Sequence, residues 1–155
     1  MEQLNDLRIS DFQSLYSDLQ IPSKTTMDGF YKGTFVGPAW LRKAAGPALV
    51  MTGLGGWWGK QFYGDGTAYN LVDKDGKLRK KFPMQLVDIH SMIDGKPGLA
   101  LHYNAENPFP WTHIVDELRQ LDPGTYLGMT YLKYKPLHKI HLPFLLHFQE
   151  DFNGL

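Results

Sequence analysis

Apolar side chains recur at helical spacing near the beginning of the chain. Spacings of three, four and seven predict one short amphipathic helix over residues 10–20, with an apolar face formed by Phe12, Leu15, Tyr16 and Leu19. Ser10 and Gln13 have the Ser-x-x-Gln form of a capping box at its start. We expect the helix to end near Gln20, because the residue before a proline is pushed out of the helical region.

The pattern changes to alternation from residue 29 onward, with turn residues at short intervals. Alternating runs rich in aromatic and β-branched residues cover 29–36, 55–62, 67–72, 85–93, 99–103, 114–121, 126–134 and 142–148, with a charged piece at 77–81. Roughly eight or nine strands of this kind predict an antiparallel barrel or sandwich. We favour an up-and-down barrel, because a helix that leads into a run of strands suits a barrel with a closed end.

A second helix is predicted between the first two strands. Pro38 stands at its first position and Gly46 just past its end, which favours a helix of two turns. We expect this helix to cap the open end of the barrel with Trp40 and Leu41 turned inward. The 155 residues then form a single domain, with the helical lead-in at 10–20 and the barrel at about 29–149.

Composition narrows the choice of partners. Sixteen basic and sixteen acidic residues give a net charge of zero, so no global field attracts nucleic acid or an anionic membrane. The chain has no cysteine, which excludes a disulfide scaffold and a thiolate metal site. With neither a signal-peptide pattern nor an apolar run of membrane-spanning length, we expect a cytoplasmic protein. A homodimer is one assembly that the sequence allows.

The segment Gly55–Phe62 places two tryptophans and a lysine among glycines, which suggests a bulge or a bend in a strand. Strict alternation would put Trp58, Lys60 and Phe62 on one face of this strand. If that face is the interior, Lys60 can anchor a polar ligand group, because a buried ammonium needs a partner. The alternative places Lys60 on the outer surface, with its stem over Trp58.

The segment Trp111–Asp122 holds the richest group of ionisable side chains. Alternation puts Asp116 on one face with Ile114 and Leu118, and Glu117 on the other face with Arg119. An aspartate on an apolar face needs a partner, which Lys60 or Arg119 could supply. A structural ion pair and a catalytic base are both open readings of Asp116. We expect Lys60 and Asp116 to be neighbours in space.

The histidines do not form a recognisable metal site. His138 and His141 fall on opposite faces of a strand, and no cysteine or clustered carboxylate completes a ligand set. We therefore expect no metal and no cofactor. His147 follows Leu146 near the end of the last predicted strand, and a single inward histidine there would leave haem binding open.

Two segments together resemble the bacterial GXWXG proteins, a family of unknown function. The first is Gly56–Phe62, which is similar to the family pattern Gly-Trp-Tyr-Gly-Lys-Arg-Phe. The second starts at Tyr103 and continues through residues 115–122 and 127–129, which are similar to Asp-x-Phe-Arg-x-x-Asp and Leu-Gly-x-Met, with Leu118 in place of the phenylalanine. The resemblance implies a calycin- or lipocalin-like barrel with an interior that accepts a small apolar molecule.

Our main functional hypothesis is a barrel that binds a small hydrophobic or amphipathic ligand with a carboxylate or a carbonyl group. The expected site consists of the walls Trp58, Phe62, Tyr103 and Leu146 and the polar groups Lys60, Asp116 and Arg119, with His147 nearby. Two alternatives use the same cavity. One is an isomerase, cyclase or lyase with Asp116 as the base and Lys60 or Tyr103 as the electrophilic group, and the other is haem binding through His147.

Overall fold

A computed structural model describes residues 2–150 and 152, with the side chain of Glu2 left aside. The helices are α1 (Glu2–Asn5), α2 (Ile9–Ser17) and α3 (Ala39–Met51), with short 3-10 helices η1 (Trp111–His113) and η2 (Leu137–Lys139). The strands are β1 (Asp28–Phe35), β2 (Trp57–Tyr63), β3 (Thr67–Lys74), β4 (Lys77–His90), β5 (Pro97–Tyr103), β6 (Ile114–Asp122), β7 (Thr125–Leu132) and β8 (Leu142–Phe148).

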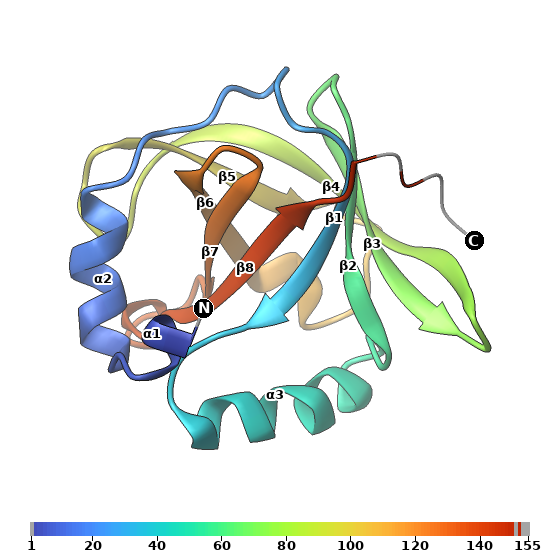
Figure 1. The fold of residues 1–155 in the computed structure, drawn as a ribbon, viewed down its shortest axis with the longest axis horizontal. Helices are drawn as coiled ribbons and strands as arrows, with labels where there is room; N and C mark the ends of the chain where they lie inside the picture. The colour runs from blue at the N-terminus through green and yellow to red at the C-terminus, as the bar shows by residue number, and fades with distance from the viewer. Residues whose placement is uncertain (1, 151, 153–155) are drawn as a thin grey trace.

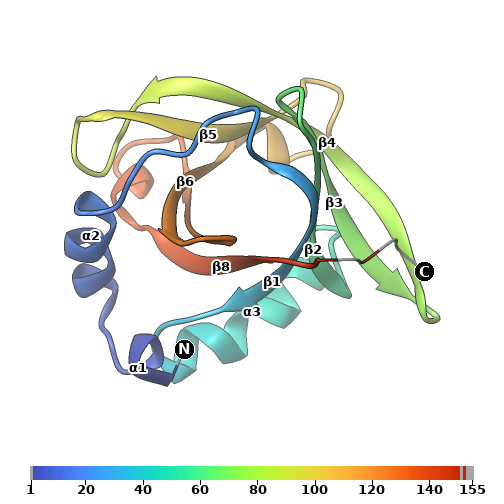
Figure 2. The ribbon, with the colours of Figure 1, turned by 45° about the horizontal axis from the view of Figure 1, so that its top comes forward.

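The eight strands form a closed antiparallel barrel in which each strand pairs with its neighbours in sequence. Closure comes from pairing of β1 with β8, in a register that sets Gly33 opposite Leu146. The ribbon closes on itself, with α2 at its side and α3 across one end (Figures 1 and 2). The predicted barrel is thereby confirmed.

One strand is longer than the alternation indicated. Residues 77–81 and 85–90 belong to the continuous strand β4, although we predicted two pieces, and the second piece ends at His90 rather than at residue 93. Its register against β3 shifts between Tyr69 and Asn70, opposite the segment that contains Phe82. Phe82 has φ of 55°, a left-handed value that lets the strand bend without ending.

Both predicted helices form, but their bounds differ from our expectations. Helix α2 begins at Ile9, and its first turn is closed by the backbone N–H of Arg8, which donates to Asp11 Oδ2 at 2.9 Å, so Ser10 is not the cap. Helix α3 continues past Gly46 and through Pro47 to Met51. The expectation that it stops at Gly46 was wrong, because its apolar face continues to Leu49 and packs on the barrel core.

The core has an inner and an outer part. Inside the barrel, inward side chains of all eight strands pack together, among them Tyr31, Phe62 and Leu146. Outside it, Phe12 and Tyr16 of α2 cover Leu127 and Leu145, which point away from the interior. The barrel therefore has a buried surface on both sides of β7 and β8, and α2 is the layer that closes the outer one.

Candidate functional site

The first strand of the site, β2, does not alternate as we predicted. Trp57 pairs with Val72 and Gly59 with Leu71, so Trp58 is an extra residue in a β-bulge. Trp57 therefore points inward with Lys60, whereas Trp58 stacks on Phe152 outside, with ring centroids 5.0 Å apart. The assignment of Trp58 to the ligand site was wrong for this reason, and Trp57 takes its place.

Two glycines make the inward placement of Trp57 and the bulge possible. A Cβ at Gly33 would collide with the Trp57 indole, and a Cβ at Gly59 would collide with the carbonyl oxygen of Tyr31. Strands β1 and β2 thus approach each other more closely at this point than any larger residue would permit.

Lys60 and Asp116 meet inside the barrel as an ion pair. Lys60 Nζ lies 3.2 Å from Asp116 Oδ2, and the residues are only 2% and 3% exposed. The outer-surface alternative for Lys60 is therefore wrong, and the expected proximity of Lys60 and Asp116 is confirmed. Thr130 on β7 donates to the other carboxylate oxygen, Oδ1, at 2.7 Å, which fixes the plane of the Asp116 carboxylate.

An amide and a phenol complete the polar group around Lys60. Its ammonium donates to Asn70 Oδ1 at 2.7 Å, and Asn70 Nδ2 donates to the Tyr103 hydroxyl at 2.9 Å. The Trp57 indole N–H donates to the same Asn70 oxygen at 3.1 Å. Longer contacts join the ammonium to the Tyr103 hydroxyl at 3.4 Å and the Met84 sulfur at 3.6 Å. These contacts hold Lys60 in one orientation.

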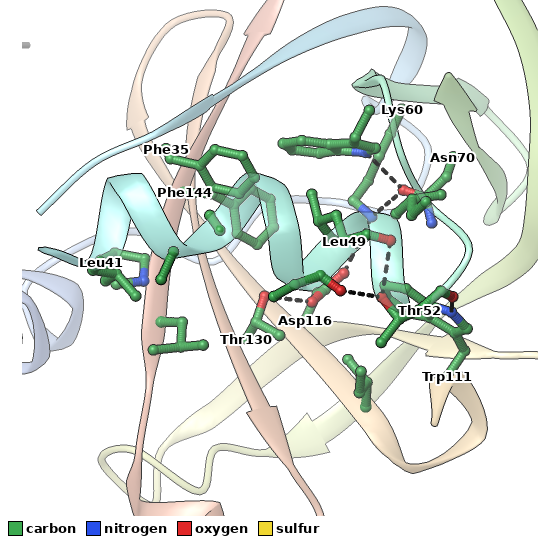
Figure 3. A pocket seen from close by; sticks show the side chains of 18 of the residues that line it. Phe35, Leu41, Leu49, Thr52, Lys60, Asn70, Trp111, Asp116, Thr130 and Phe144 are labelled. Carbon is green, nitrogen blue, oxygen red and sulfur yellow. Dashed lines mark hydrogen bonds and ion pairs between the residues drawn. The ribbon is translucent and has the colours of Figure 1, made fainter. Parts of the chain in front are cut away.

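A cavity of about 310 Å³ lies beside this polar group. Its lining is apolar except for Lys60, Asp116, Asn70, Tyr103 and the threonines at 52 and 130. Helix α3 supplies one wall with a stripe of small and apolar residues at helical spacing, Leu41, Ala44, Ala45, Ala48 and Leu49. Figure 3 shows Phe35 and Phe144 beside this helix, with Lys60 and Asp116 nearer its Thr52 end. The volume lies at the lower end of the range for small-molecule sites.

Burial changes the acid–base properties of two groups in the cavity. Loss of water lowers the pKa of the Lys60 amine, although the Asp116 carboxylate partly opposes that effect. Burial raises the pKa of the Tyr103 phenol well above its usual value, and the nearby negative charge of Asp116 adds to the rise. Tyr103 is therefore a neutral hydrogen-bonding group at physiological pH.

The other predicted site residues lie elsewhere. Phe62 and Leu146 are buried in the barrel core but do not line the cavity. Arg119 lies on the outer face, where its guanidinium binds Asp94 with Nη2 3.0 Å from Oδ1. Its assignment to the site was wrong, because it shares the outward face of β6 with Glu117.

His147 also lies outside the barrel. It alternates with the inward Leu146 on β8, and its Nδ1 is 3.3 Å from the Thr125 hydroxyl. Haem binding in the barrel therefore lacks the histidine that would have been its iron ligand. In the part of the chain that the structure describes, no group of three or more histidine, cysteine or acidic side chains is arranged to hold a metal.

Sequence reasoning missed several lining residues for identifiable reasons. Asn70 is a polar residue in an alternating strand, so the sequence gives no sign that it is buried. Its burial follows from hydrogen bonds to residues of other strands. Trp40, expected to face inward, is 62% exposed, whereas the neighbouring Leu41 is buried. The spacing of alanines in α3 was the available signal for a helix that leaves room beneath it.

Comparisons with known proteins show the fold alone. No family model and no curated protein matches the chain. A crystal structure of a protein from Thermomonospora curvata is similar to it, with a TM-score of 0.73 and 18% sequence identity over 96% of this chain and 93% of that one. This likeness is consistent with a calycin-like barrel. Within the described residues, no helix has the length and apolarity needed to cross a bilayer.

Proposed function

We propose that this barrel binds a small, mostly apolar and uncharged molecule without converting it, and that a carbonyl oxygen is the ligand group that the cavity suits best. The single observation that carries the proposal is the buried Lys60–Asp116 pair at the polar end of an otherwise apolar cavity. Such a cavity has the composition of a small-molecule site, with few polar groups that orient the ligand.

The ion pair argues for an uncharged ligand. Lys60 already has a counter-ion at 3.2 Å, so the polar end of the cavity carries no net charge. A ligand carboxylate would gain attraction from Lys60 but meet repulsion from Asp116, and it would lose its own hydration. Of the two ligand groups that the sequence suggested, the carbonyl is therefore the better candidate.

The hydrogen bonds of Lys60 favour an acceptor on that ligand. Two of the three ammonium hydrogens have short partners, Asn70 at 2.7 Å and Asp116 at 3.2 Å. The third has only the longer contacts to Tyr103 and Met84. A carbonyl oxygen in the cavity could replace these weaker contacts with a charge-assisted hydrogen bond.

The pairing of Asp116 weighs against the isomerase, cyclase or lyase alternative. Asp116 is paired with Lys60 and accepts from Thr130, so a proton taken from a substrate would leave the buried Lys60 ammonium without its counter-ion. Kinship with the GXWXG proteins and a cytoplasmic location remain proposals that accord with a binding role.

Matched eight-carbon ligands test this function. At pH 7 we expect 2-octanone to bind at least about tenfold more tightly than octanoate, a difference of about 1.4 kcal/mol. Isothermal titration calorimetry gives both affinities, and quenching of tryptophan fluorescence gives an independent signal. Equal or tighter binding of octanoate would overturn the proposal that the ligand is uncharged.

A pair of variants on α3 locates the binding. Ala45 lines the cavity, so Ala45→Phe fills part of its volume and should abolish binding of 2-octanone. Lys43→Phe adds the same ring to an exposed position of the same helix and should retain the wild-type affinity. If both variants bind equally well, the ligand occupies another place.

A further inference from the structure

Lys60 differs from every other lysine in its surroundings. Within residues 2–150 it is the one buried lysine, and the remaining lysines are exposed or half-exposed. Its amine lies at the wall of an apolar cavity, with a carboxylate at 3.2 Å. An amine, a proton acceptor and a space for an organic molecule thus come together at one place.

We propose that Lys60 forms a reversible covalent imine with an aldehyde bound in the cavity, with Asp116 as the proton carrier and then the counter-ion. This inference rests on the proposed function, because it concerns ligands of the same cavity, and it assigns them a reactive class. An aldehyde carries the carbonyl group that the site suits and has an unhindered carbon for attack by an amine.

The reaction balances with the groups present. Asp116 takes a proton from the Lys60 ammonium, and the nitrogen lone pair attacks the aldehyde carbon, so that a C–N bond forms. The carbonyl electron pair moves to oxygen, which takes a proton from nitrogen and gives a carbinolamine. Asp116 then returns its proton to the hydroxyl group, water leaves, and a protonated imine remains beside the Asp116 carboxylate.

The surroundings of Lys60 favour each stage. Burial lowers the pKa of the amine, which raises the fraction of free amine at neutral pH. The apolar lining limits the water that would hydrolyse the imine. The protonated imine keeps the positive charge of the ammonium, so the buried carboxylate of Asp116 stays neutralised after the reaction.

The test uses octanal and sodium cyanoborohydride, which converts an imine into a stable secondary amine. At a limiting octanal concentration and pH 7, we expect peptide mapping by mass spectrometry to find at least about tenfold more octyl adduct on Lys60 than on any exposed lysine, because the cavity holds the aldehyde next to this amine. Labelling spread evenly over the lysines would overturn the inference. This result needs only the wild-type protein.

Variants identify the roles of the two partners. Lys60→Arg keeps the positive charge and should lose the selective adduct. Asp116→Asn should slow adduct formation by about tenfold or more, because it removes the proton carrier. Lys80→Arg is the control, because Lys80 is exposed and lies over the Tyr63 and Tyr69 rings outside the cavity. It should leave labelling of Lys60 unchanged, and circular dichroism verifies the fold of each variant.

Titration with 2-octanone separates this inference from the proposed function. If 2-octanone binds but Lys60 is not selectively labelled, the imine is refuted and the binding function stands. If Lys60 is labelled but 2-octanone does not bind, the imine stands and the proposal of non-covalent binding fails. If neither occurs, both are wrong.

Discussion

Strand β6 carries ionised side chains on both of its faces, and the two faces surround them differently. On the inner face, Asp116 pairs with Lys60 beside a cavity. On the outer face, Glu117 and Arg119 are enclosed by protein, and neither lines that cavity. One strand thus holds a candidate binding site on one side and a structural network on the other.

The outer network attaches α2 to the barrel, and Tyr16 is its centre. The Tyr16 hydroxyl donates to Glu117 at 3.1 Å, its carbonyl accepts from Arg119 at 3.0 Å, and the guanidinium lies 4.3 Å from its ring. Tyr131 donates to the same carboxylate at 2.7 Å. Burial, followed by the charge of Glu117, raises the pKa of the Tyr16 phenol, so it stays a donor.

The comparison shows that buried charge alone does not identify a site. Both faces of β6 hold nearly inaccessible ionised groups with specific partners, and on the outer face the buried Nε–H of Arg119 has none among the described residues. The difference is the apolar space beside the inner pair. The space beside the pair therefore separates a binding role from an architectural one.

The largest expected effect is on stability, from removal of one partner of the inner pair. Lys60→Met leaves Asp116 buried without its counter-ion, and we expect a loss of about 3–5 kcal/mol in the free energy of unfolding. Urea denaturation measures it. The double variant Lys60→Met/Asp116→Leu should recover most of the loss, because no unpaired charge remains. A single variant as stable as the wild type would contradict the burial of the pair.

Removal of the outer cation, Arg119, should lower the free energy of unfolding by a smaller amount. Arg119→Met leaves Asp94, whose side chain is 9% exposed and lies where water can replace part of the lost contacts. We expect a loss of about 1–3 kcal/mol by the same urea measurement. Amide hydrogen exchange should also become faster in α2, with a smaller change in the strands of the barrel. A loss larger than that of Lys60→Met would reverse the ranking of the two faces.

Acid should weaken the outer region through Asp94. Burial opposes its ionisation, but hydrogen bonds from Arg119 and the Lys96 backbone outweigh this and lower its pKa from 3.8 to about 2. The unfolded chain therefore binds this proton first, so the contribution of Asp94 to stability is complete above about pH 4 and is lost as the pH falls toward 2.

Urea denaturation at pH 5 and near pH 2 measures that contribution. The stability difference between the wild type and Asp94→Asn should shrink on acidification. Asp88→Asn is the control, because the Asp88 side chain is 84% exposed in its ion pair with Lys24 and should contribute little at either pH. A constant difference for Asp94→Asn would show that Arg119 does not hold this carboxylate ionised.

The smallest expected effect distinguishes the adjacent tryptophans. Trp57→Phe removes the indole N–H that binds Asn70 and part of the cavity wall, so 2-octanone should bind about five- to tenfold more weakly, or about 1 kcal/mol. Trp58→Phe alters the outer surface and should change the affinity less than about twofold. Calorimetry measures both variants. The opposite order would mean that Trp58, not Trp57, faces the ligand.

The sequence predicted the barrel and the central ion pair for different reasons. Alternation and turn residues define strands locally, so the barrel and its end helix followed from short-range patterns. The contact between Lys60 and Asp116 could be predicted because a buried charged side chain needs a partner of opposite charge. The bulge at Trp58 was not predicted, since it depends on the pairing of β2 with β3, and one extra residue exchanged the faces of the two tryptophans.

Asn70 and helix α3 show a second limit of the same kind. Nothing in the alternation of β3 indicates that Asn70 joins Lys60, Tyr103 and Trp57, because these partners come from two other strands, β2 and β5. The continuation of α3 through Pro47 likewise depends on the core beneath Leu49. Features that depend on contacts between distant segments were therefore the ones that the sequence concealed.

The most direct test of the account is the effect of Asp116→Asn on ligand preference. The substitution keeps the shape of the side chain but removes the charge that neutralises Lys60 and repels an anion. Calorimetry with 2-octanone and octanoate should show the wild-type preference for the ketone narrowed or lost in the variant, with octanoate gaining at least about tenfold in affinity. An unchanged preference in a folded Asp116→Asn protein would contradict the claim that the Lys60–Asp116 pair selects an uncharged ligand.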